Sequence, residues 1–359
     1  MKTIEDVREM DIGKELEQLW GSQEHSRIRA CLFNLIIYSR EPRRTAYFHS
    51  LVQMIIENFP CRIIFIEGTG NDDDFIRTDV SVKGSGKGGE IACDQIRIQA
   101  SGESMAKVPF LLLPHIVPDL PVYLLWGQDP TQDNHILPHL EGFANKVIFD
   151  SETTDNLQRF SKEMLHQMQT WESTITDLNW ARVSAWRNLF AQTFEDPEDI
   201  DHLQSSQKIA IKYNATKDDT CRNCQVQAIY LQGWLAGRLR WMFKELERNG
   251  KEVKITYITH SGSVEITLEP SFREDLPAGS IIGINVFGSH QSHYAMERIE
   301  STRQVKISIS SYDQCQIPHY TLLSNLERNH SLMKEIFYDT NSHHYSNMLQ
   351  AISQMDWRT

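Results

Sequence analysis

Two short motifs carry the residues best suited to chemistry, a glycine-rich run at residues 84–89 and a cysteine pair at Cys221 and Cys224. The run reads GSGKGG, and glycines let backbone N–H groups converge on an anion such as a phosphate. A Walker-type loop needs Ser or Thr after the lysine and then a helix, whereas Lys87 is followed by two glycines and a strand pattern. The run therefore predicts a flexible loop.

The Cys221 and Cys224 pair is a weak candidate for a redox or zinc site. It stands alone in a polar turn, with neither a second pair nor two histidines at zinc-finger spacing. Cys31 and Cys61 each open an apolar run, which predicts free, buried thiols on strands. Disulfides are unusual in reducing compartments, so this cysteine usage fits a cytosolic chain.

Acidic and imidazole side chains are numerous but lack a catalytic arrangement. In the run Asp72–Asp74 the side chains are adjacent and do not converge on one metal ion, so a solvated loop is expected. His135 and His139 are four apart without a third ligand nearby, and neither H-E-x-x-H nor G-x-S-x-G occurs. No dinucleotide fingerprint follows the first strand, where residues 39–42 read SREP. We therefore predict no catalytic residue, no bound cofactor and no metal site.

Tryptophan and arginine recur at helical spacing in two stretches of the second half. Arg182 lies one turn from Trp186, and Arg238 lies one turn from Trp234 and Trp241, a spacing that lets a guanidinium stack on an indole. Two interpretations stay open: a packed helix pair in a domain core, or a surface for a partner or an anion, because Trp and Arg dominate binding hot spots. The candidate interface residues in these stretches are Asp177, Asn179, Trp180, Arg182, Trp186, Arg187, Trp234, Arg238 and Trp241.

A proline-rich segment at residues 113–126 leads straight into an apolar run that ends at Trp126. Pro118 and Pro121 hold φ near −65°, and Pro121 pushes the residue before it toward an extended conformation. With Asp119 between them, these prolines predict a stiff entrance to a buried strand. Such a segment suits packing or support of a docking surface better than proton transfer.

These candidates must be positioned by alternating strands and helices. Cys31–Tyr38 and Cys61–Glu67 read as strands, and the amphipathic stretch Arg43–Asn58 between them reads as a helix, which makes a β-α-β unit. Three more strands are expected, with the first of them half-exposed: Ile96–Ala100, Val122–Trp126 and Lys146–Phe149. The first half is therefore predicted as a Rossmann-like α/β sheet layer.

The second half is predicted to be a mixed sheet with antiparallel hairpins. A hairpin is expected around His260-Ser261-Gly262, and a long helix is expected over Val226–Phe243. Gly233 and Gly237 would leave a smooth stripe on that helix, where another element can approach closely. Further elements are expected as helices from residue 157 and residue 177 and as strands at Lys208–Tyr213, Ile281–Phe287 and Val305–Ile309.

The segment FDSETT, dense in helix-capping residues, marks the expected domain boundary. We predict two packed α/β domains, an N-terminal one at residues 1–152 and a C-terminal one at residues 153–322. The last segment, residues 323–359, is expected to form a surface helix and a tail.

Composition excludes two classes of partner. The 359 residues carry a net charge of −12, and the 36 Lys and Arg residues are scattered, so the basic surface that nucleic acid requires is not evident. No apolar run is long enough for a membrane helix, and the charged start MKTIEDVREMD is unlike a signal peptide. These features predict a cytoplasmic protein that binds neither nucleic acid nor membrane.

Four segments together resemble the OpcA family, the glucose-6-phosphate dehydrogenase assembly proteins. They occur in the family's order and are LPHIVPDLPVYLLWG, FDSETT, DLNWARVSAWRNLFAQTF and QAIYLQGWLAGRLRW. The resemblance covers most of residues 30–245 and is less clear over the last part of the chain. It implies a non-enzymatic effector that binds glucose-6-phosphate dehydrogenase, promotes its active oligomer and so controls NADPH supply. In some members the effect responds to redox state, which here would need the Cys221 and Cys224 pair.

The leading hypothesis is accordingly a cytosolic assembly factor and allosteric activator of glucose-6-phosphate dehydrogenase. The alternative is a sugar-phosphate-binding or nucleotide-binding α/β enzyme or sensor, with its pocket at the carboxyl ends of the first sheet's strands. Self-association stays open at this point.

Overall fold

The computed structural model describes residues 9–22, 28–70, 74–85, 91–216, 223–250, 252–312, 315–323 and 343–357. Outside them lie Cys221, most of the glycine-rich run, two of the three adjacent aspartates and most of the predicted tail. The described chain divides into two compact units. Unit 1 runs to Asp150 and takes in Gln167–Thr176, and unit 2 holds Ser151–His166 and the residues from Asp177 onward.

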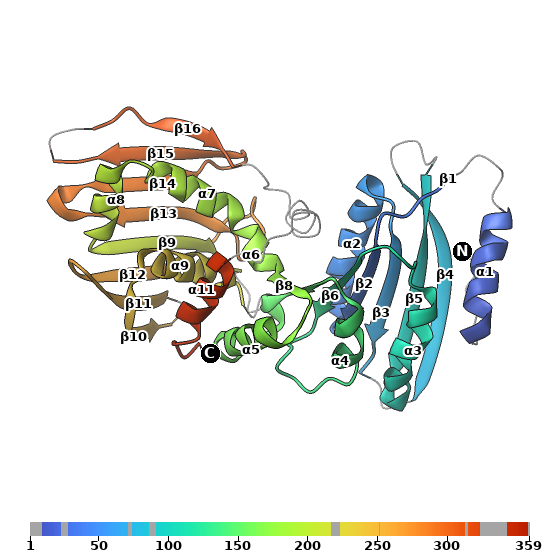
Figure 1. Ribbon diagram of the computed structural model, residues 1–359. Helices are drawn as coiled ribbons and strands as arrows, with labels where there is room; N and C mark the ends of the chain where they lie inside the picture. Colours follow the sequence, from blue (N-terminus) through green and yellow to red (C-terminus); the bar gives the residue numbers. More distant parts are fainter. Residues whose placement is uncertain are drawn as a thin grey trace. The chain divides into compact units, whose positions relative to one another are not determined.

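Unit 1 is built on an eight-stranded sheet, sheet A, with the strand order β1-β5-β3-β2-β6-β7-β8 and with β4 beside β5 (Figure 1). The pairs that join β1, β5, β3, β2, β6 and β7 are parallel, and β4 forms an antiparallel hairpin with β5. The strands are β1 (Ile28–Arg29), β2 (Asn34–Ser39), β3 (Arg62–Gly68), β4 (Phe75–Ser85), β5 (Ile91–Ser101), β6 (Val122–Gly127), β7 (Lys146–Phe149) and β8 (Thr174–Asp177).

The predicted β-α-β unit is confirmed by β2, helix α2 (Pro42–Asn58) and β3. Both strands are buried along their whole length, as expected for parallel strands near the middle of a sheet. Pro42 opens α2, where its missing N–H would have no helical partner in any case. Phe48, Leu51 and Ile55 are buried on the helix face that packs on the sheet.

No strand was predicted at residues 75–85, although the structure has one there. They form β4, paired residue for residue with β5 from Phe75 opposite Ser101 to Ser85 opposite Ile91. The segment reads FIRTDVSVKGS, in which β-branched residues alternate with polar ones, a pattern typical of an edge strand. Gly84 and Ser85 of the glycine-rich run, predicted as a loop, are the last residues of β4, and the rest of the run lies outside the described residues.

Unit 2 holds a second eight-stranded sheet, sheet B, with the order β10-β11-β12-β9-β13-β14-β15-β16. Only the β12 and β9 pair is parallel among the pairs of this sheet in the described chain. Its strands are β9 (Lys208–Asn214), β10 (Met242–Asn249), β11 (Glu252–Thr259), β12 (Gly262–Ser271), β13 (Ile281–Phe287), β14 (His293–Arg298), β15 (Gln304–Ser310) and β16 (His319–Leu322). The predicted mixed sheet and the hairpin of β11 and β12 are confirmed.

One face of sheet B is an apolar layer under helices (Figure 1). A row of side chains in register crosses six strands, and all of its members are buried: Val253, Leu268, Ile211, Ile284, Met296 and Ile307. Burial alternates along β11 and β14, whereas Ile281–Val286 of β13 are all buried.

The described helices include none that is both long and apolar enough to cross a membrane. Besides α2 they are α1 (Glu9–Ser22), α3 (Val108–Leu112), α4 (Leu137–Leu140), α5 (Leu157–Thr170), α6 (Leu178–Arg182), α7 (Ser184–Thr193), α8 (Pro197–Gln204), α9 (Val226–Leu239) and α11 (His343–Ile352).

Helix α9 ends earlier than predicted. The helix stops at Leu239, Arg240 takes a left-handed conformation with φ of 55°, and Met242 already starts β10. The backbone N–H of Trp241 still bonds the carbonyl oxygen of Ala236, which closes the last turn. Trp241 therefore leaves the helix, and the predicted one-turn spacing between it and Arg238 is wrong.

Helix α11 packs on the glycine stripe of α9, as the spacing of Gly233 and Gly237 predicted. A Cβ on Gly233 would lie 2.9 Å from Ile352 Cγ1, and one on Gly237 would lie 3.2 Å from the carbonyl oxygen of Asn347. Tyr345, Met348, Leu349, Ile352, Met355 and Trp357 are all buried. The predicted C-terminal helix is confirmed as α11, but it is part of the core of unit 2, so its expected surface position is wrong.

Candidate functional site

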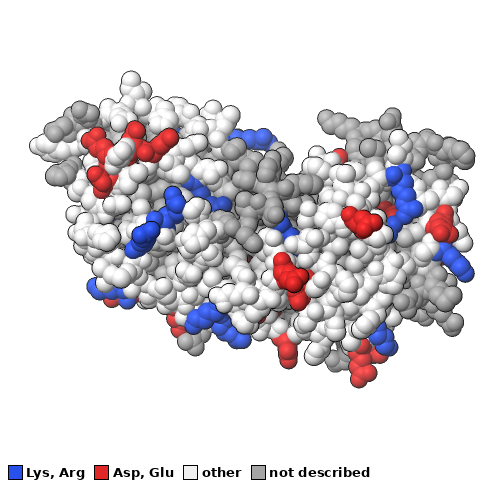
Figure 2. Space-filling view, viewed as in Figure 1, with Lys and Arg blue, Asp and Glu red and all other residues white. Residues whose placement is uncertain are grey.

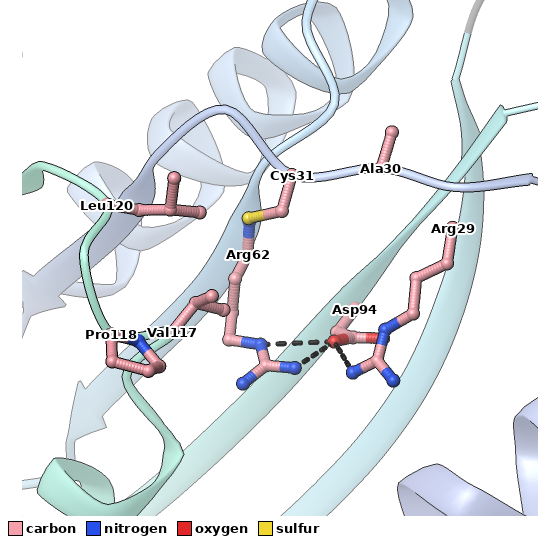
Figure 3. Close-up of a pocket in the computed structure, with 8 residues that line it drawn as sticks. All are labelled: Arg29, Ala30, Cys31, Arg62, Asp94, Val117, Pro118 and Leu120. Atoms are coloured by element: carbon pink, nitrogen blue, oxygen red, sulfur yellow. Dashed lines mark hydrogen bonds and ion pairs between the residues drawn. The ribbon is translucent and has the colours of Figure 1, made fainter.

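A pocket of about 510 Å³ opens at the amino ends of the sheet A strands (Figure 3). Arg62 is the first residue of β3, Asp94 lies near the start of β5, and the proline segment that forms one wall runs into the start of β6. The volume lies in the range of roughly 300–1,000 Å³ found for small-molecule sites. Open α/β sheets bind ligands at the carboxyl ends of their strands, so this pocket is at the opposite edge from the one expected.

An ion cluster forms the floor of the pocket. Asp94 Oδ2 accepts hydrogen bonds from Arg62 Nε at 3.0 Å, from Arg62 Nη2 and from Arg29 Nη2 at 2.9 Å. Its other oxygen, Oδ1, accepts one from Trp20 Nε1 of α1 at 2.6 Å. The side chains of Asp94 and Arg62 are 5% and 10% exposed, whereas that of Arg29 is 53% exposed.

The cluster keeps Asp94 ionised. Burial raises the pKa of Asp94, but the hydrogen bonds and charge of Arg62, the Trp20 indole and the charge of Arg29 together outweigh burial and hold the pKa below its ordinary value. Two guanidinium groups thus face one carboxylate, which leaves one surplus positive charge at the mouth of the pocket.

The proline segment is held from behind by two buried side chains. Asn34, fully buried at the start of β2, accepts from Val117 N–H at 2.8 Å and donates to the carbonyl oxygens of Val117 at 3.0 Å and Leu120 at 3.4 Å. Arg62 Nη1 donates to the carbonyl oxygen of His115 at 2.7 Å. These bonds fix an irregular segment whose backbone would otherwise lack partners.

At the apex of this segment Pro118 and Asp119 are exposed. Asp119 has φ of 63°, a left-handed conformation that aspartate tolerates better than most residues. Trp126, by contrast, is fully buried on β6, where it stacks on Tyr38 at 4.1 Å between ring centroids. The buried strand predicted after the proline segment is therefore observed as β6.

Cys31 also lines the pocket. Its thiol donates to the carbonyl oxygen of Phe33 at 3.3 Å, and its Sγ accepts from Arg62 N–H at 3.2 Å. Burial raises the pKa of the Cys31 thiol, so the uncharged form is favoured at neutral pH. The sequence predicted a buried thiol here; Cys61 is buried, and Cys31 is only half-buried.

At the carboxyl edge of sheet A, by contrast, polar side chains satisfy one another. Glu67 Oε1 accepts from Arg97 Nε at 2.8 Å and is hydrogen-bonded to His49 Nε2 at 2.7 Å, and Oε2 accepts from Gln99 Nε2 at 2.8 Å. Burial raises the pKa of Glu67, but these hydrogen bonds and the Arg97 charge together bring it below its ordinary value. A Cβ on Gly127 would overlap the ring of Phe48, which covers the end of β6.

In unit 2 the first Trp/Arg stretch forms α6 and α7 around a buried polar network. Asp177 caps α6 by accepting from Asn179 N–H at 2.7 Å and Trp180 N–H at 3.2 Å, and it also accepts from the Ser151 backbone at 2.8 Å. Arg182 Nη1 donates to Glu152 at 2.6 Å and to Asn179 Oδ1 at 2.8 Å. Ser151 and Glu152 belong to the capping segment FDSETT, so two of the family-like segments meet here.

The four tryptophans of these stretches, Trp180, Trp186, Trp234 and Trp241, are all buried, between 1% and 8% exposed. The Arg187 guanidinium lies 3.1 Å from the ring centroid of Trp180, and that of Arg298 lies 5.4 Å from that of Trp186. Of the two interpretations left open by the sequence, packing in a domain core is the one that holds for these indoles. A partner could reach only the more exposed arginines of these stretches.

Arg238 is exposed at the end of α9. His344, at the start of α11, lies near Arg238. Its pKa is lowered, first by burial and then by the charges of Arg238, His343 and Arg187. The ends of α7, α9 and α11 thus bring basic groups together in unit 2. Figure 2 shows Lys and Arg side chains on the helix-covered side of this unit.

The structure describes only one of the two cysteines of the predicted redox or zinc pair. Cys224 is disulfide-bonded and buried, whereas Cys221 lies outside the described residues. The free cysteines of the described chain are Cys31, Cys61, Cys93 and Cys315. No group of three or more His, Cys, Asp or Glu side chains that could hold a metal ion occurs among the described residues.

Sequence reasoning missed the charged residues of the pocket. Arg62 is a charged residue at the start of an apolar strand run, Asp94 lies near the start of β5, and Arg29 is the last residue of β1. A charge at a buried strand position is a signal that a partner charge must lie nearby. The partner could not be named, because Arg62 and Asp94 are 32 positions apart and meet only through the β3 and β5 pairing.

Solved structures similar to this chain share its fold. A 3-ketoreductase from Actinomadura kijaniata is 9% identical with a TM-score of 0.52, over 89% of this chain and 94% of that one. An oxidoreductase from Thermotoga maritima is 11% identical with a TM-score of 0.50, over 89% of this chain and 94% of that one. At this identity the likeness supports the Rossmann-like fold and says nothing of activity.

Relatives with more similar sequences come from cyanobacteria. OxPP cycle protein OpcA of Synechocystis sp. is 26% identical over 53% of this chain and 39% of the relative. The protein of the same name from Synechococcus elongatus is 27% identical over 58% of this chain and 46% of the relative. The chain thus matches less than half the length of these relatives.

Two family models match the chain in sequence order, and both describe a glucose-6-phosphate dehydrogenase subunit. The model of the N-terminal domain matches residues 52–181, and the model of the C-terminal domain matches residues 173–346. Together they cover sheet B, the sheet A strands from β3 onward and every family-like segment noted in the sequence. The chain belongs to the OpcA family.

Proposed function

We propose that this chain binds glucose-6-phosphate dehydrogenase, promotes its active assembly and catalyses no reaction itself. The observation that carries the proposal is the match of both domain models of a dehydrogenase-subunit family, in order, along one chain. The names of the cyanobacterial relatives support a place in the oxidative pentose phosphate pathway. The two Rossmann-like neighbours support the fold alone, so they add no enzymatic assignment.

The docking surface proposed on unit 2 lies at the helix ends, where Arg187 and Arg238 carry positive charge and His343 and His344 lie beside them. Arg238 is exposed, and Arg187 is braced on the buried ring of Trp180. An arginine whose side chain is already ordered loses less conformational entropy when it meets a partner. Although the whole chain carries a net charge of −12, this local basic surface would attract an acidic patch on the dehydrogenase.

Activation requires that the chain binds the active oligomer more tightly than the inactive form. Each tenfold difference in affinity shifts that equilibrium by about 1.4 kcal/mol. In this proposal the tryptophan core of unit 2 supports the basic surface, and the stiff proline segment supports unit 1.

The test mixes the purified chain with glucose-6-phosphate dehydrogenase from the same source and measures dehydrogenase rate and complex mass. We expect a complex and a higher rate, and Arg238→Glu should weaken binding at least tenfold. Lys306→Glu is the matched control, because Lys306 is exposed on β15 between buried residues that face the helices, so its side chain is on the other face of sheet B.

Absence of both a complex and a rate change at micromolar concentrations of each protein would overturn the proposal. If Lys306→Glu and Arg238→Glu weaken binding of the dehydrogenase equally, the proposed function stands but the proposed docking surface is wrong. A thermal-shift screen of the chain alone against sugar phosphates and nucleotides tests the alternative, since a ligand at 100 times its Kd adds about 2.7 kcal/mol of stability.

A further inference from the structure

Arg29 is the group in the sheet A pocket with hydrogen-bonding capacity left over. Its guanidinium gives one nitrogen, Nη2, to Asp94 and stacks at 5.3 Å on the ring of Trp20. Arg62, in contrast, uses Nε and Nη2 on Asp94 and Nη1 on the carbonyl oxygen of His115. Arg29 Nε and Nη1 therefore stay available at the half-exposed mouth of the pocket within the described structure.

The charge of the cluster suits an anion with a single negative charge. Two guanidinium groups and one carboxylate leave a surplus of one positive charge, and Asp94 and Arg62 are too deeply buried for water to screen them well. A phosphate monoester carries about −1.5 to −2 at neutral pH. It would place excess negative charge beside Asp94, whereas a carboxylate would balance the cluster.

The rest of the pocket wall is apolar and preformed. Val117, Pro118 and Leu120 come from the proline segment and face the ion cluster across the pocket (Figure 3). Asn34 fixes the backbone of Val117 and Leu120, so a ligand would not have to order this wall. Among the described residues no aromatic ring lines the pocket, which disfavours a stacked nucleotide base.

We propose that this pocket binds the carboxylate of a molecule with a branched aliphatic group, with the carboxylate on Arg29 and the aliphatic group against the proline segment. Arginine binds carboxylates through paired N–H donors, and the second N–H of Nη2 offers such a pair with Nε or Nη1, on the side that faces away from Asp94. The carboxylate could come from a free acid or from an acidic side chain of a protein. This inference does not depend on the dehydrogenase proposal.

Calorimetric titration of the full chain with 4-methylpentanoate tests the chemistry, and 4-methylpentanamide is the neutral control of the same shape. The acid should bind at least tenfold more tightly than the amide. Arg29→Gln should remove that preference, and Arg77→Gln, which changes an exposed arginine of β4 outside the pocket, should leave it unchanged. Because Asp94 keeps its hydrogen bonds to Arg62 and Trp20, we expect the Arg29→Gln variant to fold. Its melting temperature checks this.

Equal binding of acid and amide, or an acid preference that survives Arg29→Gln, would overturn the proposal. So would the absence of any binding up to 10 mM acid, roughly the weak end of millimolar affinities. The blocked peptide acetyl-Leu-Glu-Leu-amide distinguishes the sources, because its only carboxylate is a side chain. Tighter binding of the peptide than of the acid assigns the pocket to a protein carboxylate, and the reverse assigns it to a free acid.

Cys31 provides a second readout that does not rely on heat of binding. We expect 4-methylpentanoate to slow alkylation of Cys31 by iodoacetamide several-fold, as measured by mass spectrometry of the Cys31 peptide. Cys315, exposed in unit 2, serves as the internal control and should react at the same rate with and without the acid. Protection of Cys315 as well, or protection of Cys31 that persists in Arg29→Gln, would count against the site.

Discussion

Arg62 Nη1 donates to the carbonyl oxygen of His115 at 2.7 Å, across 53 positions of sequence. The same guanidinium holds Asp94 through Nε and Nη2. One buried side chain thus ties the start of β3 to both β5 and the proline segment that leads into β6. The amino edge of sheet A is therefore a single bonded network, in which the pocket, the prolines and the ion cluster are fixed together.

Asn34→Ala should destabilise unit 1 by about 2–4 kcal/mol. The substitution removes the amide that satisfies the Val117 N–H and two carbonyl oxygens, and each buried group left without a partner costs about 1–3 kcal/mol. Urea unfolding followed by circular dichroism measures the change. Asn58→Ala is the control, because Asn58 is exposed at the end of α2 and its bond to Met54 is exposed to water. A loss below 0.5 kcal/mol, about the size of ordinary surface changes, would show that Asn34 does not hold the segment.

Asp94→Asn should lower stability at neutral pH by about 3 kcal/mol, because it leaves two guanidinium groups without their anion. The pKa of Asp94 is lowered in the folded protein, so its contribution is present above the ordinary value of 3.8 and is lost as pH falls through the folded pKa. The stability gap between wild type and variant should therefore narrow below about pH 4. Urea midpoints between pH 7 and pH 3 measure it, with the exposed Asp133→Asn as control. A difference in stability between wild type and variant that does not change with pH would contradict an ionised Asp94.

Gly233→Ala should loosen α11 from α9. The added Cβ would lie 2.9 Å from Ile352 Cγ1, and overpacking of this kind costs about 1–3 kcal/mol. Thermal unfolding and hydrogen exchange of residues 343–352 measure the effect. In Gly13→Ala, a helical glycine with open space around it, the same substitution should instead stabilise by about 0.5–1 kcal/mol. If both substitutions stabilise the protein, α11 can shift away from α9 without a loss of stability.

Replacing Pro118 and Pro121 together by alanine should lower stability by about 1–2 kcal/mol, since each proline restricts the unfolded chain by about 0.4–1 kcal/mol. If the segment supports the proposed dehydrogenase complex from behind, binding should stay within twofold of wild type below the melting temperature. The two measurements are a thermal melt and a titration with the dehydrogenase. Lost binding with an unchanged melting temperature would instead place the exposed Pro118 in the contact itself.

The sequence by itself determined the elements whose signal is local. Buried parallel strands such as β2 and β3 are continuous apolar runs, and the stiff entrance at Pro118 and Pro121 follows from ring geometry. The glycine spacing in α9 indicated a close approach, and the family-like segments indicated the OpcA family. None of these depends on which distant residue lies opposite.

Only the tertiary structure decided what meets what. Arg62, Asp94 and Arg29 form a cluster because β3 and β1 both pair with β5, and no local pattern encodes that pairing. Arg240 ends α9 in a left-handed turn before β10, although the apolar spacing continues to Phe243. Burial likewise separated the tryptophans, which fill the core of unit 2, from Arg238, which stays in water. Periodicity reports which face of an element is apolar, whereas a site depends on the neighbours that strand pairing and packing supply.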